Sequence, residues 1–229
     1  MKITHHTRAI ILLLVSLAAV FTFSTEGKAF SGARNRIFLS AGQVPLTLKA
    51  PEDMCFIDQS SPDFEPIYSA FKYAVEKKGT DMLLAIFTDC SSLGDANAVP
   101  ETKDILLNSG IVVWTSPGAT EYFPATRKEY LDAREPIFKD RVKRKLANTT
   151  ELKVDDKPVK TDNSIIIGAS GIYETLYEHK TTSTIFADTM IKGVPLEVTL
   201  HNTSKTSLNL KHLYQTVDNF INMQIILNE

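Results

Sequence analysis

The sequence predicts an α+β fold, an α/β sandwich in which helices cover a single, largely antiparallel sheet. Residues 82–87 (MLLAIF) form an uninterrupted apolar run between polar residues, which is typical of a strand buried on both faces. From residue 172 to residue 201, strand-like segments follow one another as a β-meander, and Lys192 and Gly193 supply a two-residue hairpin turn. An amphipathic helix follows this meander.

The N-terminus has the pattern of a bacterial secretory signal. Lys2 and Arg8 form a positive region, an apolar run covers residues 9–23, and Gly27 and Ala29 fit the small-residue positions of a cleavage site. The run has about 15 residues, fewer than the ~20 that span a bilayer comfortably. We therefore predict a signal peptide over residues 1–29 and a single globular domain over residues 30–229, periplasmic or secreted and without a stable membrane span after cleavage.

Cys55 and Cys90 are the two cysteines of the chain. In an oxidising compartment, two cysteines without a competitor usually pair, so we expect a structural disulfide, with two buried free thiols as the alternative. No C-x-x-C motif is present, so the signature of a thioredoxin-like redox function is missing.

In the first half of the domain, the alternating residues 44–48 and the apolar residues 54–57 predict two short strands. Ser61 as N-cap and Pro62 in the first turn predict the start of a helix that ends near Gly79. A loop and a short helix over residues 103–108 precede a strand over residues 111–114.

In the second half, residues 126–147 predict a charged helix that Pro136 breaks or kinks. Residues 151–160 predict an exposed hairpin or loop. A strand over residues 164–167 is then expected to end in a glycine-rich turn before the meander. The final helix is expected to be capped near Ser207, and its apolar stripe comprises Leu210, Leu213, Tyr214, Val217, Phe220, Ile221 and Ile225.

The order of these elements over about residues 44–227 is similar to that of uncharacterised exported bacterial proteins and of the PsbP/Mog1-like α/β sandwich. The resemblance implies the architecture alone, and no functional residue is transferred from it.

Two residues are candidate nucleophiles for an exported hydrolase. Ser170 lies in a Gly-Ala-Ser-Gly stretch after an apolar run, but a nucleophile elbow requires glycine two residues after the serine, where this chain has Ile172. Cys90 needs a free thiolate, which pairing with Cys55 removes. The histidines that such a site could use are His179, His201 and His212, whose spacing is not that of metal ligands.

Two features indicate a partner-binding surface. Trp114, Tyr122 and Phe123 lie around a loop interrupted by proline and glycine, where aromatic side chains often contact partners. Residues 139–145 contain the densest group of cations, although nearby acids predict a largely self-paired helix face. The candidate partner surface therefore comprises Trp114, Tyr122, Phe123, Arg141, Lys143 and Arg144.

Composition and motifs narrow the function further. A net charge of −2 gives no reason to expect a nucleic-acid partner, and neither nucleotide-binding glycine motif occurs. We expect no cofactor or metal. The sequence favours an exported, non-enzymatic domain that binds another envelope or secreted protein or assists cell-envelope processes. The alternatives are the hydrolase described above and a carrier of a small ligand or lipid, which requires a large apolar cavity.

Overall fold

The computed structural model describes residues 35–62, 64–77, 81–93, 108–115, 126–147, 152–174, 179–204 and 210–229. All of them belong to one compact unit, Gly32–Glu229. The predicted signal peptide lies outside the described residues, as do the cap at Ser207 and the helix end near Gly79. The predicted helix over residues 103–108 also lies outside them, except for Asn108, which begins a strand.

The elements follow one another in an order that places most strands next to their neighbours in sequence. In chain order they are β1 (Arg36–Ala41), β2 (Val44–Lys49), β3 (Met54–Phe56), α2 (Glu65–Glu76), β4 (Asp81–Asp89), η2 (Cys90–Leu93), β5 (Asn108–Thr115), α4 (Arg127–Lys145), β6 (Lys153–Val154), β7 (Val159–Lys160), β8 (Ile165–Glu174), β9 (His179–Ile191), β10 (Val194–Ser204) and α5 (Leu210–Asn228).

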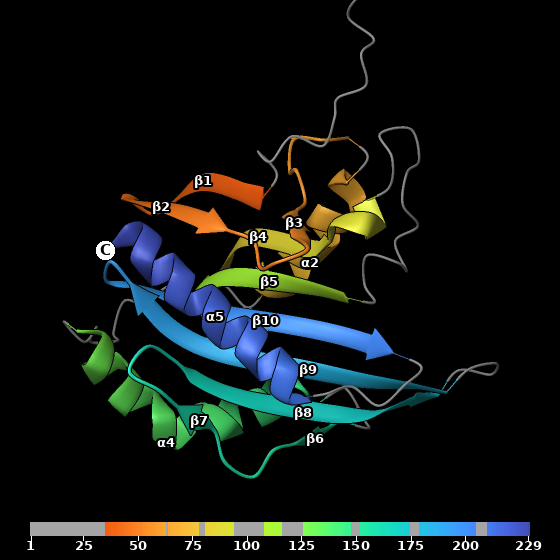
Figure 1. Ribbon diagram of the computed structural model, residues 1–229, viewed down its shortest axis with the longest axis vertical. Helices are drawn as coiled ribbons and strands as arrows, with labels where there is room; N and C mark the ends of the chain where they lie inside the picture. Colours follow the sequence, from red (N-terminus) through yellow and green to blue (C-terminus); the bar gives the residue numbers. More distant parts are fainter. Residues whose placement is uncertain are drawn as a thin grey trace, which may run out of the picture. The chain divides into compact units, whose positions relative to one another are not determined.

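Eight strands form one sheet in the order β3-β4-β5-β10-β9-β8-β6, and β7 also pairs with β8. Every pairing is antiparallel. Strands β1 and β2 form a separate two-stranded hairpin, which lies beside α5 (Figure 1). A largely antiparallel sheet with packed helices is the predicted α+β class, which the structure confirms.

The β9–β10 hairpin occupies the middle of the sheet, and its turn explains its register. Lys192 and Gly193 both have positive φ, 50° and 74°, as a type I′ turn requires at its two central residues. The turn sets Ile191 opposite Val194 and leads into eleven successive pairs. The two-residue hairpin predicted at this point is therefore confirmed.

The two faces of the sheet are covered by different elements. On one face, α5 and the β1–β2 hairpin enclose a core that includes Leu48, Phe87, Ile185, Val198 and Phe220. On the other face, α2 packs over β4 and β5, and α4 packs over β8 and β9. Because side chains alternate along a strand, β4, β5, β8 and β9 each contribute residues to the cores on both faces.

The glycine-rich stretch after residue 167 is not a turn, contrary to the prediction. Residues 165–174 form one continuous strand, β8, because β9 pairs with it over its whole length. Within it, Gly168 provides space: a Cβ there would lie 2.6 Å from the carboxylate of Asp155, which accepts a hydrogen bond from Tyr214. The glycine thus serves close packing and not chain reversal.

Other boundaries also differ from the prediction. Helix α2 begins at Glu65 and not near Ser61, because Pro66 occupies its first turn and the preceding residues form turns around Asp58. Strand β1 was not predicted. Helix α4 continues through Pro136 without a break, and Thr126 closes its N-terminus with a capping box.

Gly110 in β5 lies directly opposite Phe87 in β4, and the phenyl ring covers it. A Cβ at position 110 would lie 2.1 Å from the Phe87 ring. That ring also contacts Phe56 and Phe220, so it cannot move aside without disturbing the core between the sheet and α5.

We predict that Gly110→Ala lowers the free energy of unfolding by about 3 kcal/mol, because the added methyl group overpacks the site. Chemical denaturation measures this value. The variant Gly110→Ala with Phe87→Leu should lose less than the two single losses combined, because the smaller side chain makes room for the methyl group. Strictly additive losses would contradict the proposed clash.

Candidate functional site: an open strand edge and a buried ion cluster

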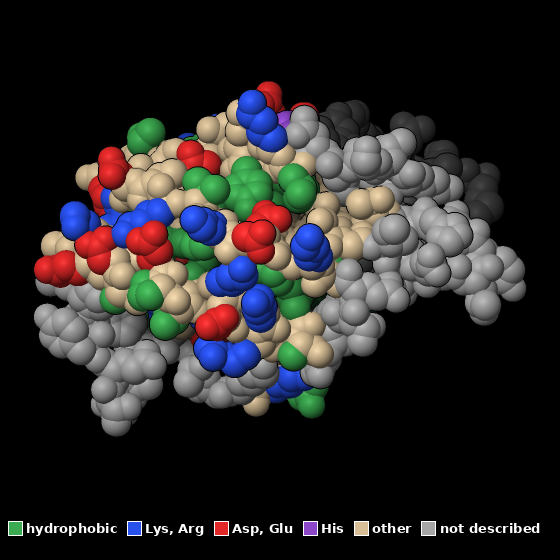
Figure 2. Space-filling view, turned by 90° about the horizontal axis from the view of Figure 1, so that it is seen from below, with side chains coloured by type: hydrophobic (Ala, Val, Ile, Leu, Met, Phe, Trp, Pro, Cys, Tyr) green, Lys and Arg blue, Asp and Glu red, His purple; other side chains and the backbone are tan. Residues whose placement is uncertain are grey.

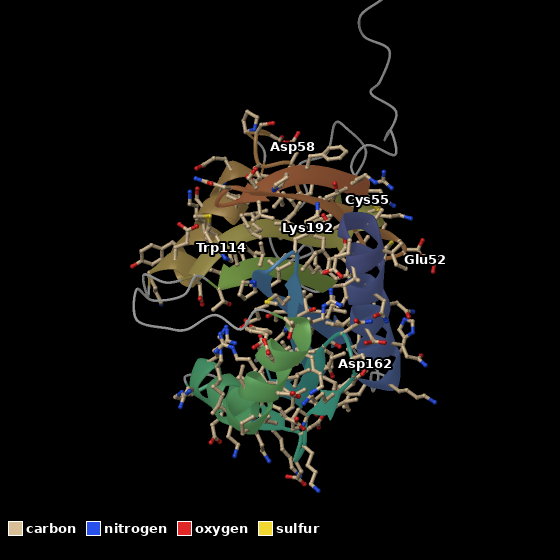
Figure 3. The ribbon with its side chains drawn as sticks, turned by 90° about the vertical axis from the view of Figure 1, so that its left-hand side faces the viewer. Glu52, Cys55, Asp58, Trp114, Asp162 and Lys192 are labelled. Carbon is tan, nitrogen blue, oxygen red and sulfur yellow. A yellow bond between two sulfur atoms is a disulfide. The ribbon has the colours of Figure 1, made fainter. Side chains whose placement is uncertain are left out.

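The disulfide predicted between Cys55 and Cys90 is present, with the two Cα atoms 4.9 Å apart. It joins β3 at the edge of the sheet to the segment that follows β4, and Cys55 is buried beneath α2. Closing a loop of this length stabilises the fold by about 4 kcal/mol in the chain-entropy model. Cys55 and Trp114 lie toward opposite ends of β4 (Figure 3).

The candidate nucleophiles Ser170 and Cys90 are not assembled into a hydrolytic site with His201. Cys90 has no free thiol, because its sulfur is in the disulfide. Ser170 pairs with Ser183 of β9, whereas His201 pairs with Thr184. Ser183 and Thr184 are adjacent in one strand, so Ser170 and His201 project from opposite faces of the sheet.

His201 is held by two hydroxyl groups. Its Nδ1 lies 3.0 Å from Thr184 Oγ1 and its Nε2 lies 3.1 Å from Thr203 Oγ1. Burial lowers the pKa of His201, so the neutral ring is favoured. His212 is exposed on α5, and the side chain of His179 lies outside the described part of the chain.

The described residues of the candidate partner surface lie on two elements, β5 and α4. Trp114 is half-buried, and its ring lies 3.3 Å from the position that a Cβ on Gly42 would take. Lys143 and Arg144 are exposed on α4, but the side chain of Arg141 is only 14% exposed and points into the protein. Tyr122 and Phe123 lie outside the described residues. Figure 2 shows the cations of the side that it views interspersed with acids and not gathered into one patch.

Arg141 belongs to a cluster that we call the buried ion cluster: Arg134, Arg141, Lys145, Asp188 and Glu197. Its two carboxylates lie directly opposite each other on β9 and β10. Arg141 donates to Asp188 Oδ2 and to Glu197 Oε2, each at 2.6 Å. Lys145 lies 2.5 Å from Glu197, and Arg134 lies 3.9 Å from Asp188. Helix α4 is therefore attached to the sheet by charge as well as by apolar contacts.

Within this cluster, burial has its largest effect on Asp188. It raises the pKa of Asp188 to about 6, although Arg141 favours the carboxylate, and one oxygen, Oδ1, is buried without a hydrogen-bond partner. Burial alone would lower the pKa of Arg141, but Asp188 and Glu197 outweigh it and hold that pKa above its ordinary value.

The sequence analysis did not identify Asp188 and Glu197. A signal was present, because each acid interrupts an otherwise apolar or hydroxyl-bearing strand, in FADTM and PLEVT. A buried strand tolerates a carboxylate only when a cation reaches it. The cations on the neighbouring charged helix were instead expected to pair within that helix.

The β1–β2 hairpin has one closed and one open edge. A two-residue turn places Ala41 opposite Val44. From this pair onward, the backbone N–H and C=O groups of successive residues point alternately toward the partner strand and away from it. On β2 the outward positions are Pro45, Thr47 and Lys49. On β1 they are the residues opposite these, Ser40, Phe38 and Arg36.

Helix α5 closes the outward edge of β2. The Asn228 side chain exchanges two hydrogen bonds, both 2.8 Å, with the backbone of Thr47. One helical turn earlier, Gln224 does the same with the backbone of Lys49, with both distances 2.9 Å. Pro45 has no N–H to satisfy. Two amide side chains thus replace a neighbouring strand along β2.

The outward edge of β1 is open as far as the described residues go, because β1 pairs there with β2 alone. We call the outward N–H and C=O groups of Arg36, Phe38 and Ser40 the β1 edge. Phe38 is 79% exposed, whereas Ile37 and Leu39 pack against the core on the opposite face of the strand. β1 lies on the side of the hairpin away from α5 (Figure 1).

The edges of the eight-stranded sheet are less suited to pairing. Strand β3 has three residues, and its middle residue, Cys55, is in the disulfide. Strands β6 and β7 have two residues each. Short strands are a common way to prevent unwanted pairing at an edge. Among the described strands, β1 has no strand neighbour on its outward side over any of its six residues.

Chemically, the β1 edge can add an extended peptide through main-chain hydrogen bonds. Within the described ranges, no group of three or more His, Cys, Asp or Glu side chains is placed to hold a metal ion. None of the helices in those ranges is both long and apolar enough to cross a bilayer.

Comparisons with protein-family models and with curated proteins give no match. Among solved structures, the chain is similar to LpqN of Mycobacterium tuberculosis, which is involved in cell envelope biogenesis. The match has a TM-score of 0.38 and 12% sequence identity, and it covers 81% of this chain and 86% of that chain. A TM-score of this size establishes neither a common topology nor a common activity.

We predict that Asp188 makes the fold less stable as pH rises from about 4 to about 6. In this range the folded protein keeps a proton that the unfolded chain, with an Asp pKa near 3.8, has released. The free energy of unfolding should therefore fall by about 3 kcal/mol relative to Asp188→Asn, which cannot titrate. Denaturant unfolding of both proteins across this range measures the difference.

Asp132→Asn is the matched control. Hydrogen bonds from Lys128 and Lys160 lower the pKa of Asp132 to about 2, so its stabilising contribution is lost only as pH falls below about 4. From pH 4 to pH 6, the difference in stability between Asp132→Asn and the wild-type protein should therefore stay nearly constant, whereas the difference for Asp188→Asn should change. A pH-independent difference for Asp188→Asn would contradict the assignment.

Proposed function

We propose that this protein is an exported, non-enzymatic domain that binds an extended segment of a partner protein in the cell envelope or outside the cell. The observation that carries the proposal is the open β1 edge. Strand addition uses main-chain hydrogen bonds for affinity and alternate side chains for specificity. An unpaired strand that displays an exposed phenylalanine meets both requirements.

The contrast between the two edges of the hairpin supports this function. An exposed edge carries a risk of aggregation, and folded proteins usually block it. Here α5 blocks β2 with two amide side chains, whereas β1 carries no charge at its centre, no proline and no bulge in its pairing with β2. An edge that is left open beside one that is closed is typical of a surface reserved for a partner.

The disulfide supports the exported location, because such bonds persist in oxidising compartments and are rare in the cytosol. The N-terminal pattern of charge, apolar run and small residues supports it independently. Export also gives the domain access to envelope or secreted proteins as partners.

The strand-addition function predicts that Ser40→Pro weakens peptide binding. The Ser40 N–H points away from β2, so proline removes a donor of the β1 edge without removing a hairpin hydrogen bond. We expect the wild-type protein to select extended peptides from a displayed random library, and the variant to bind them at least about tenfold more weakly. Titration by fluorescence anisotropy gives the affinities.

Ser40→Ala is the control, because it keeps the N–H and should bind as the wild-type protein does. Thermal unfolding of both variants checks that the hairpin is intact. Equal peptide affinities for Ser40→Pro and Ser40→Ala would show that binding does not use the β1 edge.

The proposed export predicts that the mature protein, recovered from the periplasm or the medium, begins after Ala29 and has no free thiol. N-terminal sequencing and thiol labelling of the denatured protein measure both properties. A full-length cytosolic chain with Cys55 and Cys90 both reduced would contradict export.

A further inference from the structure

The partner's chemistry can be inferred from the side chains that flank the β1 edge, on condition that the proposed strand addition is correct. The exposed face of the hairpin carries Phe38 opposite Thr47 and, one pair further, Arg36 opposite Lys49. Phe38 is the apolar centre of this face, and the two cations lie on one side of it. The opposite face of the strand is directed to the core.

Arg36 and Lys49 form a like-charge pair directly across two strands, an arrangement that destabilises a sheet. Within the described ranges, neither side chain has an acidic partner among the ion pairs. A carboxylate placed beside Arg36 would relieve the repulsion, so the charge complement of this site is an acid.

We infer that the β1 edge binds an antiparallel segment in which an apolar residue is followed two positions later by Asp or Glu. In an antiparallel pair, the partner residue opposite Phe38 and the one opposite Arg36 are separated by two positions, with the latter nearer the C-terminus. The apolar residue then covers the exposed ring of Phe38. The acid then lies directly opposite Arg36, and Lys49 lies in the same row one strand further away.

The other face of the added strand lies beside Ile37 and Leu39, which are only partly buried. Residues of the segment that flank its central apolar position would extend this apolar layer. Branched apolar residues suit these positions, because they favour strands and pack on a half-buried surface. The full recognition pattern is therefore apolar at three successive positions and acidic at the fourth.

A second copy of the chain fits this charge pattern less well. In the symmetric register centred on Phe38, Arg36 of one copy faces Ser40 of the other, so no acid reaches the cations. The residues that precede β1 do not fit either. Their one acid, Glu26, follows Ser24 at the position where the pattern requires an apolar residue. The charges therefore favour a separate partner protein.

The test uses three acetylated, fluorescein-labelled peptides that differ at one position: Thr-Val-Phe-Val-Glu-Thr and its Gln and Lys counterparts. Titration of the purified protein by fluorescence anisotropy gives each affinity. We expect the Glu peptide to bind about threefold to tenfold more tightly than the Gln peptide, and the Lys peptide to bind most weakly. Added salt should reduce the preference for Glu.

Charge reversal on the protein sharpens the test. Arg36→Glu places opposite charges across the hairpin, so its fold should be at least as stable, and the preference should change to the Lys peptide. Lys72→Glu, an equal change of charge on α2 over the opposite face of the sheet, should leave the preference for Glu unchanged.

The outcomes separate the inference from the proposed function. Equal affinities for the Glu and Lys peptides, both lost in Ser40→Pro, would overturn the acidic pattern and leave strand addition standing. Affinities that Ser40→Pro does not change would overturn strand addition itself. A dimer in sedimentation that Ser40→Pro converts to a monomer would assign the edge to a second copy and overturn the separate partner.

Discussion

The structure depends on a sheet that must be covered on both faces. Strands β9 and β10 run antiparallel through its middle. Alternation sends successive side chains of β9 to opposite cores, whereas β10 places its apolar side chains on one face and Glu197 on the other. Two layers are therefore required: α5 with the β1–β2 hairpin on one face, and α2 with α4 on the other. The same alternation separates Ser170 from His201 and brings Asp188 and Glu197 to one face. Sites on this fold are therefore set by strand register.

The parts of the fold that could be predicted are those in which local pattern and tertiary role agree. The apolar run of β4, the turn at Lys192 and Gly193, and the amphipathic stripe of α5 each have a strong local signal. The stretch around Gly168 was misassigned because glycine signals a turn locally, whereas here it makes room for Asp155 and Tyr214. That contact joins segments far apart in sequence, so no local pattern contains it.

The candidate site was harder to predict than the fold. Arg141 could be seen as one cation among many, but its carboxylate partners lie 47 and 56 residues away. The β1 edge is not visible in the sequence, because an edge is defined by the absence of a neighbour, and strand order is a tertiary property. The disulfide was predictable, because with two cysteines in the chain only one internal pairing exists.

The two layers that cover the sheet should respond differently to pH, because the amides of Gln224 and Asn228 attach β2 to α5 in one of them. Amides do not ionise, so the attachment of β2 to α5 is the same in acidic and in neutral surroundings. The opposite layer is anchored through Asp188 and responds to acidity. The attachment of the hairpin to α5 is therefore independent of the protonation of Asp188, on which the opposite layer depends.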